Sequence, residues 1–555
     1  MSIINRIPPL PLAARWQKHF PAKLLPASPD RNMIRKSVGR KLLANQELCD
    51  RFVRSLKIRP DEVIIEGYAG VGALTRSLLS GGESSKDASG WSSTLLEEIS
   101  LESQTQVASK SRSKKGKYPS WLDDLPASSS MASSSTNPKA ETEAEAQGDS
   151  STSTKPKLVV ASEGSIELLV RSFNYPPKAD TLSASGKPAA SDPYTREIPV
   201  LQTPLHPNLL LSHSTAYVWP TLPKILANPL VVEQLPVHDP TLIGAEATKR
   251  SWEDPEPPIT LVCQMPDSSI GEQLAAQWIG SAVGDPGQKR TWIWEWGRIR
   301  LALLCGKSLY DRIMAPPASI VNCKLSILTQ ALFDIVPLPP FHHVVNVDKQ
   351  SRFTEDRPSK PLSSVPISAE TPLGIPSESS SSSNGLITQF EAGIPKNQNR
   401  TQTFPLDFFP PQTTSQRLIG KPLDRPDLLG LMLIPKLQSP ILASQKDTWD
   451  YVMRRMFVRD TLTVRAALPN LNFGAETLIT NIEKSNTNTN TDTNTGEDGE
   501  GFRGIPVNGE RVIRDLTIPE WLRIVDVFDK WAFKPDNLIL DSGNPDETSR
   551  EVGQD

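Results

Sequence analysis

The stretch VIIEGYAGVGALTRSLL, residues 63–79, decides the fold class. An apolar run ends at Glu66, glycines follow at Gly70 and Gly72, and the residues after them are typical of a helix. A strand, a glycine loop and a helix in this order open a doubly wound α/β domain, in which the glycines let the backbone approach a ligand closely. No Gly-Lys-Ser/Thr follows, so the loop is not a Walker A loop. A carboxylate before the loop suits a ligand with an amino-acid moiety, such as S-adenosylmethionine.

Two later segments repeat the pattern of a strand that ends in polar residues. KPKLVVASEGSIELLVRSF, residues 155–173, has Glu163 at the end of its strand, where this fold class holds a pair of ribose hydroxyls. The alternative for Glu163 is an acid that the dipole favours at a helix N-terminus. The strand of PPITLVCQMPDSSIGEQLAAQWI, residues 257–279, leads into Gln264, Pro266 and Asp267.

Three segments have compositions too polar to bury a core, and we predict that they are disordered: 80–154, 349–403 and 484–509. About 400 residues remain, enough for roughly two to three domains. We predict an α/β domain over 37–348 that carries the first insertion, a linker over 349–403, and a closing strand with a helical domain over 404–555.

The net charge of −3 points to no class of partner, but its distribution is uneven. Residues 1–43 contain nine Lys or Arg and one acid, Asp30. We predict a mitochondrial transit segment or a basic arm over 1–36, the alternative being a solvated arm that binds phosphate. Prolines interrupt the apolar runs, so no membrane span is expected. Four scattered cysteines and six histidines show no zinc-site spacing, and we predict no metal.

Several segments, in this order, resemble the rRNA adenine N6-dimethyltransferases and their descendants, the mitochondrial transcription factor B proteins, including the fungal-type mitochondrial transcription factor 1. They are SVGRKLLANQELCDRFVRSL (37–56), EGYAGVGALT (66–75), VVASEGS (159–165), VCQMPDSSI (262–270), residues 300–338, TFPLDFFPPQ (403–412), LLGLMLIPK (428–436), and the helical segments 449–471 and 518–535.

The resemblance implies a Rossmann-like S-adenosylmethionine-dependent methyltransferase fold with a smaller helical C-terminal domain. It implies a catalytic motif, here degenerate, at Gln264, Pro266 and Asp267. The residues that it places at the cofactor are Leu42, Glu66, Gly67, Tyr68, Gly70, Gly72, Glu163 and Gln264. The basic residues that we expect at nucleic acid are Lys307, Arg312, Arg454, Arg455, Arg459 and Arg465, with an ordinary solvated helix face as the alternative.

The departures from the family pattern bear on activity. Tyr68 replaces the first glycine of the cofactor loop, and Asp267 replaces the aromatic residue that stacks on the target base. The loss of that ring removes roughly 1–3 kcal/mol of stacking. Arg40, Lys41 and Leu42 also depart from the pattern of the methylating members. The resemblance therefore favours the transcription-factor branch: a monomer in the mitochondrial matrix that assists mitochondrial RNA polymerase at promoter DNA. The alternative is an active mitochondrial rRNA adenine N6-dimethyltransferase that binds RNA.

Two further patterns leave alternatives open. HPNLLLSHSTAYVWPTL, residues 206–222, contains Asn208 and Tyr217 and is a second candidate for the catalytic motif, although the order of elements favours Gln264–Asp267. Trp292, Trp294 and Trp296 alternate as on a strand with one aromatic face, either for stacking on bases or for burial.

Overall fold

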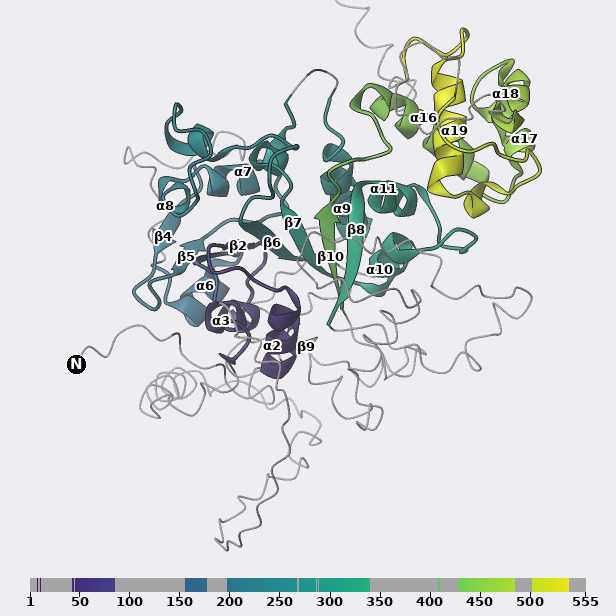
Figure 1. Ribbon diagram of the computed structural model, residues 1–555. Helices are drawn as coiled ribbons and strands as arrows, with labels where there is room; N and C mark the ends of the chain where they lie inside the picture. The colour runs from purple at the N-terminus through teal and green to yellow at the C-terminus, as the bar shows by residue number, and fades with distance from the viewer. Residues whose placement is uncertain are drawn as a thin grey trace, which may run out of the picture. The chain divides into compact units, whose positions relative to one another are not determined.

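An eight-stranded sheet forms the centre of the computed structural model, in the order β4-β5-β3-β2-β6-β7-β10-β8 (Figure 1). The structure describes residues 7, 10, 42–43, 45–84, 155–176, 197–266, 269–285, 287, 289–339, 408–409, 428–484 and 502–538. The strands of this sheet are β2 (Val63–Glu66), β3 (Leu158–Ser162), β4 (Val200–Gln202), β5 (Leu209–Ser212), β6 (Ile259–Gln264), β7 (Arg300–Cys305), β8 (Phe333–Leu338) and β10 (Leu429–Pro435).

The direction of the strands identifies the fold class. Strands β5, β3, β2, β6 and β7 pair in parallel, and β10 is inserted antiparallel between β7 and β8. From β2 the chain proceeds outward through β3 and β5, and it then returns to the other side of β2 at β6. This reversal is the topological switch point of a doubly wound sheet. The fold is therefore doubly wound and Rossmann-like, as predicted.

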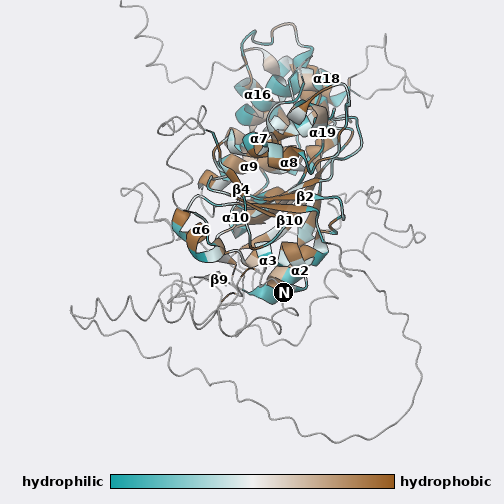
Figure 2. Ribbon diagram, turned by 90° about the vertical axis from the view of Figure 1, so that its left-hand side faces the viewer, coloured by the Kyte–Doolittle hydropathy of each residue, from teal (hydrophilic) through white to brown (hydrophobic). Residues whose placement is uncertain are grey.

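Helices cover both faces of the sheet. Figure 2 shows α2 (Gln46–Ser55), α3 (Ala73–Ser80) and α6 (Ile166–Phe173) on one side of the strands, and α7 (Thr221–Leu226), α8 (Pro229–Val232) and α9 (Ser269–Ser281) on the other. Every residue of β2, β3 and β7 is buried. Parallel strands covered on both faces are continuously apolar for this reason. Arg300 at the start of β7, which is 2% exposed, pairs with the fully buried Glu62 just before β2.

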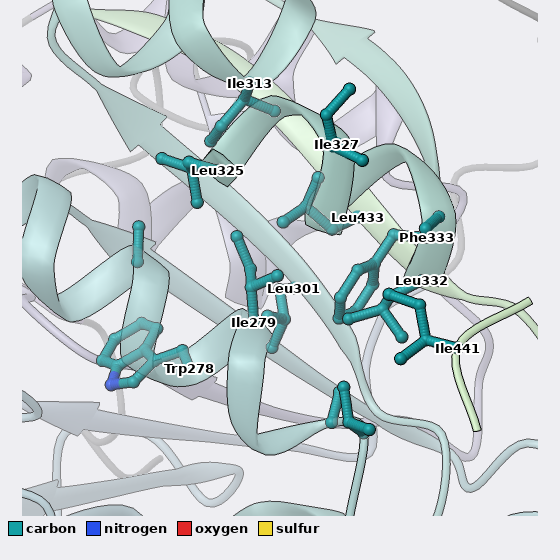
Figure 3. Packing of buried hydrophobic residues seen from close by; sticks show 14 of the residues in the cluster. Trp278, Ile279, Leu301, Ile313, Leu325, Ile327, Leu332, Phe333, Leu433 and Ile441 are labelled. Atoms are coloured by element: carbon teal, nitrogen blue, oxygen red, sulfur yellow. The ribbon is translucent and has the colours of Figure 1, made fainter. Parts of the chain in front are cut away.

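The second half of the sheet packs through a continuous apolar core. Phe333 at the start of β8 and Leu332 just before it meet Leu433 of β10 and Ile441 after it (Figure 3). Helices α10 (Lys307–Met314) and α11 (Lys324–Leu332) connect β7 to β8. A two-stranded sheet pairs β1 (Leu42–Leu43) with β9 (Phe408–Phe409).

The C-terminal segment is helical, as the sequence predicts. Its main helices are α16 (Lys446–Met456), α17 (Val464–Ala467), α18 (Ile479–Glu483) and α19 (Ile518–Asp529). Tyr451 of α16 stacks on Phe528 of α19 with ring centroids 5.6 Å apart. The side-chain amide of Asn322 donates a 2.7 Å hydrogen bond to the carbonyl of Arg514, which joins this segment to the α10–α11 region.

The limits of two predicted disordered segments are wrong. Helix α3 runs to Ser80, and Ser84 donates a 2.6 Å hydrogen bond to the buried Asp50. At the other segment, Val507 is 1% exposed, and the amide of Gly509 donates to Glu483 across 2.8 Å. The polar composition suggested that these residues could not offset the entropy that a chain loses on ordering. The hydrogen bonds and the burial of Val507 offset it locally. The rest of the predicted disordered residues lie outside the described residues.

The tryptophan-rich segment is a 3-10 helix, η6 (Trp292–Trp296), so the predicted strand is wrong. All three indoles are buried, and Trp292 stacks on Trp219 with centroids 4.6 Å apart. Each indole N–H has an acceptor: the carbonyl of Trp219, and the hydroxyls of Ser281 and Thr248. The alternation of tryptophans is compatible with the burial alternative but predicted the wrong backbone conformation. A short 3-10 turn inside a core can also bury side chains that point in several directions.

Within the described residues, none of the helices has the length and apolar character needed to cross a bilayer. The described part of the chain also holds no group of three His, Cys, Asp or Glu residues that could bind a metal ion.

Candidate functional site

The candidate site lies where the carboxyl ends of β3, β2 and β6 meet. Ligands of doubly wound sheets bind at this edge, beside the switch point. Strand β2 ends at Glu66, and the loop after it turns into α3 through Gly70 (φ 58°) and Gly72 (φ 77°). A Cβ atom on Gly72 would lie 2.3 Å from Cζ of Phe173. Glycine is therefore required there for both backbone conformation and space.

Glu66 is buried at the end of β2. Its carboxylate accepts a 2.5 Å hydrogen bond from the hydroxyl of Thr75, and its side chain lines the cavity described below. Burial raises the pKa of Glu66 to about 7; the Thr75 hydrogen bond opposes this rise and the nearby Glu163 adds to it. At neutral pH the carboxyl group is therefore only partly ionised, which weakens the attraction for an ammonium group that the sequence suggested.

Glu163 ties the glycine loop to the end of β3. One carboxylate oxygen accepts the N–H of Gly70 and the other accepts the N–H of Ser165, each across 2.8 Å. The residue is fully buried. The sequence predicted that this carboxylate would hold ribose hydroxyls. In the structure both of its oxygens bind backbone amides, and its position just before α6 also fits the alternative that we had left open.

Arg76 is a site residue that sequence reasoning missed. Its Nη1 atom donates to the carbonyls of Val71 and Gly72 across 2.9 and 2.7 Å. The buried guanidinium group therefore holds the main chain of the glycine loop. Burial lowers the pKa of Arg76 to about 9, although Glu66 opposes the shift. The sequence feature that could have indicated this role is a basic residue in the first helical turn after the glycine loop.

Tyr68 and Tyr217 meet at the mouth of the site. Their ring centroids are 5.1 Å apart, and the Tyr217 hydroxyl donates a 2.6 Å hydrogen bond to the main-chain oxygen of Gln264. Tyr217 comes from the loop after β5, and its neighbour Ala216 packs on Gly67. A Cβ atom on Gly67 would lie 2.9 Å from that of Ala216. Because Gly67 has no side chain, the loop that carries Tyr217 can pack closely against it.

A small cavity lies at the end of β2, beside Tyr68. Its volume is about 20 Å³, which holds about one water molecule. Glu66, Gln264 and the Tyr68 ring line it together with Leu43, Val71 and Leu304. The Tyr68 side chain lines this cavity at a position where the family pattern has a glycine, so it takes up space that a glycine would leave.

The structure places the motif that we favoured at the end of the strand next to β2. Strand β6 pairs in parallel with β2, whereas Leu209–Ser212 forms β5 on the far side of β3. Gln264 ends β6. Pro266 follows it, and its carbonyl oxygen lies so close to α9 that a Cβ atom added to Gly271 would be 1.9 Å from that oxygen. Asp267 lies outside the described residues, and of Leu42 the structure describes only the backbone, in β1.

The predicted basic residues differ in their surroundings. Lys307 pairs with Asp311, and Arg312 with Glu272 across 2.8 Å, as expected of a solvated helix face. Arg454 pairs with Asp450 across 3.3 Å, and Arg455 lies over the ring of Tyr451.

Arg459 and Arg465 do not belong to one helix with these residues. Arg459 is exposed in the 3-10 turn η10 (Phe457–Arg459), whereas Arg465 lies in α17. Arg465 binds Glu483 and Glu510 across 2.7 and 3.0 Å. The predicted single helical region is therefore wrong, because the chain turns between Asp460 and Thr463.

The comparisons with known proteins give structural likeness alone. No family model matches the sequence, and no curated protein matches it. The chain is similar to a dimethyladenosine transferase from Plasmodium falciparum, with 11% identity, a TM-score of 0.36, and coverage of 88% of this chain and 98% of that one. It is also similar to the 23S rRNA methyltransferase ErmE, with 10% identity, a TM-score of 0.34, and coverage of 88% and 100%.

Proposed function

We propose that this protein is a mitochondrial transcription initiation factor that has kept a methyltransferase fold and has lost methyl transfer. It binds promoter DNA, assists mitochondrial RNA polymerase, and helps to separate the strands. The observation that carries the proposal is the position of the Tyr68 side chain, which lines the small cavity at the end of β2 and lies against the ring of Tyr217.

Three further features support the loss of methyl transfer. The raised pKa of Glu66 weakens its attraction for a cationic ligand, and Glu163 is held by the amides of Gly70 and Ser165. In addition, the Tyr217 hydroxyl donates a hydrogen bond to the main-chain oxygen of Gln264. In this proposal the mouth of the cavity receives an unpaired base without modifying it, and the exposed Arg459 and its neighbours in α16 contact phosphates.

The second candidate is an S-adenosylmethionine-dependent mitochondrial rRNA adenine N6-dimethyltransferase. The observation that favours it is the retention of Glu66, Gly70, Gly72 and Glu163 at the strand ends where the cofactor of this fold class would bind. In this case Tyr68 must swing out of the cavity before the cofactor enters.

Run-off transcription separates the two candidates. The assay contains the purified full chain and mitochondrial RNA polymerase, with either a duplex promoter template or the same template melted beforehand. We expect transcription from the duplex to require the protein and transcription from the melted template to require it much less. Equal yields with and without the protein on both templates would overturn the proposal. Transfer of labelled methyl groups to small-subunit rRNA would then support the enzyme.

A further inference from the structure

Helix α2 and the residue that ends it present a strip of basic side chains to solvent, formed by Arg51, Arg54 and Lys57 (the α2 basic strip). All three residues are exposed, and they follow one another at intervals of three. This spacing places Arg51 and Arg54 side by side on one face of the helix. Lys57 comes directly after the C-cap residue Leu56 and extends the strip beyond the last turn.

The charges of the α2 basic strip are not neutralised by acids. Within the part of the chain that the structure describes, none of its three side chains forms an ion pair with a carboxylate. Arg54 donates a 2.9 Å hydrogen bond to the carbonyl of Gly82, which leaves its charge uncompensated. Arg312 on α10, in contrast, pairs with Glu272 across 2.8 Å. The α2 basic strip therefore carries a positive charge that is available to a partner.

Lys57 adopts a backbone conformation that suits glycine. Its φ angle is 49°, and its N–H donates to the carbonyl of Arg54 across 3.3 Å, just past the helix end. The residue at this position of a helix is usually glycine. The helix dipole favours a cation near the C-terminus, but it does not require one in this strained conformation. A lysine held there indicates that its charged side chain has a use.

The composition of the exposed face of α2 selects a phosphate backbone as the partner. The apolar side chains of the helix, Leu48, Phe52 and Val53, are buried, so this face offers neither an apolar surface for lipid tails nor an aromatic ring for a base. Cations without either feature fit phosphate groups. Residues 31–41, just before this region, contain five Lys or Arg and no acid, so the basic character continues along the sequence.

We propose that the α2 basic strip binds the phosphate backbone of duplex DNA, as a contact surface additional to the basic residues of α16 and η10. The inference rests on the proposed function, in which the protein binds promoter DNA. Contacts of this kind hold DNA irrespective of its sequence. Each one contributes about one unit to the slope of log affinity against log salt concentration.

The test measures that slope by fluorescence anisotropy, with a labelled duplex and the full chain. The variants are Arg51→Ala and Lys57→Gly, and we expect each to make the slope shallower by about one. Because glycine suits a positive φ, thermal unfolding of Lys57→Gly should give a midpoint no lower than that of the wild type. Weaker binding by this variant would then reflect the lost charge and not a damaged helix end.

Lys289→Ala is the matched control. Lys289 is exposed and follows α9, which lies on the other side of the sheet from α2 (Figure 2). We expect this variant to keep the wild-type slope, although it loses the same charge.

Each contrary result has its own meaning. Wild-type slopes for both α2 variants, or an equal loss of slope in Lys289→Ala, would overturn the inference while DNA binding stands. A wild-type chain that does not bind the duplex would overturn the proposed function as well.

Discussion

The hydroxyl oxygen of Tyr217 lies 2.6 Å from the main-chain oxygen of Gln264, so the loop after β5 is bonded to the end of β6. These are the two segments that competed in the sequence as the catalytic motif. The fold brings both to one site and gives them different tasks. Gln264 ends β6, and Tyr217 brings an aromatic ring against Tyr68.

Tyr68→Gly should restore space for the cofactor. The substitution removes the ring that stands beside Glu66 and Val71 in the cavity. We expect the dissociation constant for S-adenosylmethionine, measured by isothermal titration calorimetry, to fall by about tenfold or more, equivalent to about 1.4 kcal/mol. Tyr68→Phe keeps the ring and should bind as the wild type does. Identical affinities for all three proteins would show that Tyr68 does not close the site.

Glu66→Gln should change how stability depends on pH. Below about pH 4.5 the carboxyl group is protonated in both the folded and unfolded states. Between pH 4.5 and about 7 the folded protein holds the proton more tightly, because burial raises the pKa from 4.5 to about 7. The free energy of unfolding therefore falls as pH rises through this window, by about 3 kcal/mol from this group.

The glutamine variant lacks this titration and can still accept the hydrogen bond from Thr75. Urea unfolding of both proteins at about pH 5 and about pH 7.5 should show the variant gaining stability relative to the wild type at the higher pH. If the free energy of unfolding depended on pH in the same way in both proteins, the raised pKa of the buried Glu66 carboxyl group would be contradicted.

Gly72→Ala should destabilise the loop. The alanine would have to adopt φ near 77°, and its Cβ atom would overlap the Phe173 ring at 2.3 Å. We expect a loss of roughly 2–4 kcal/mol in the free energy of unfolding. Gly280→Ala in helix α9 is the control, since nothing lies within 4 Å of its Cβ position. That variant should be up to about 1 kcal/mol more stable. Equal effects at the two glycines would refute the close approach of the loop to Phe173.

Arg459→Ala should reduce the salt dependence of DNA binding. A phosphate contact contributes about one unit to the slope of log affinity against log salt concentration. Arg459 is exposed, whereas Arg465 is held by Glu483 and Glu510. We expect the slope, measured by anisotropy over a salt series, to fall by about one for Arg459→Ala and to stay unchanged for Arg465→Ala. The reverse result would place the DNA on the α17 side.

The sequence by itself determined the α/β class, the glycine loop and the central strands that lead into the polar residues of the site. Strands such as β2 and β3 are buried on both faces and must be apolar throughout, so they are visible without any knowledge of their neighbours. The need for glycine at Gly72 is equally local, because a positive φ excludes most other residues.

Only the tertiary structure decided which groups meet. Tyr217 and Gln264 are 47 residues apart, and their contact depends on the path of a loop that no periodicity reports. The same holds for Glu163, whose oxygens bind the amides of Gly70 and Ser165, and for Arg465, whose two carboxylate partners come from other segments. A residue's own sequence neighbourhood encodes whether it is buried, but its polar partners are set by the packing of distant segments.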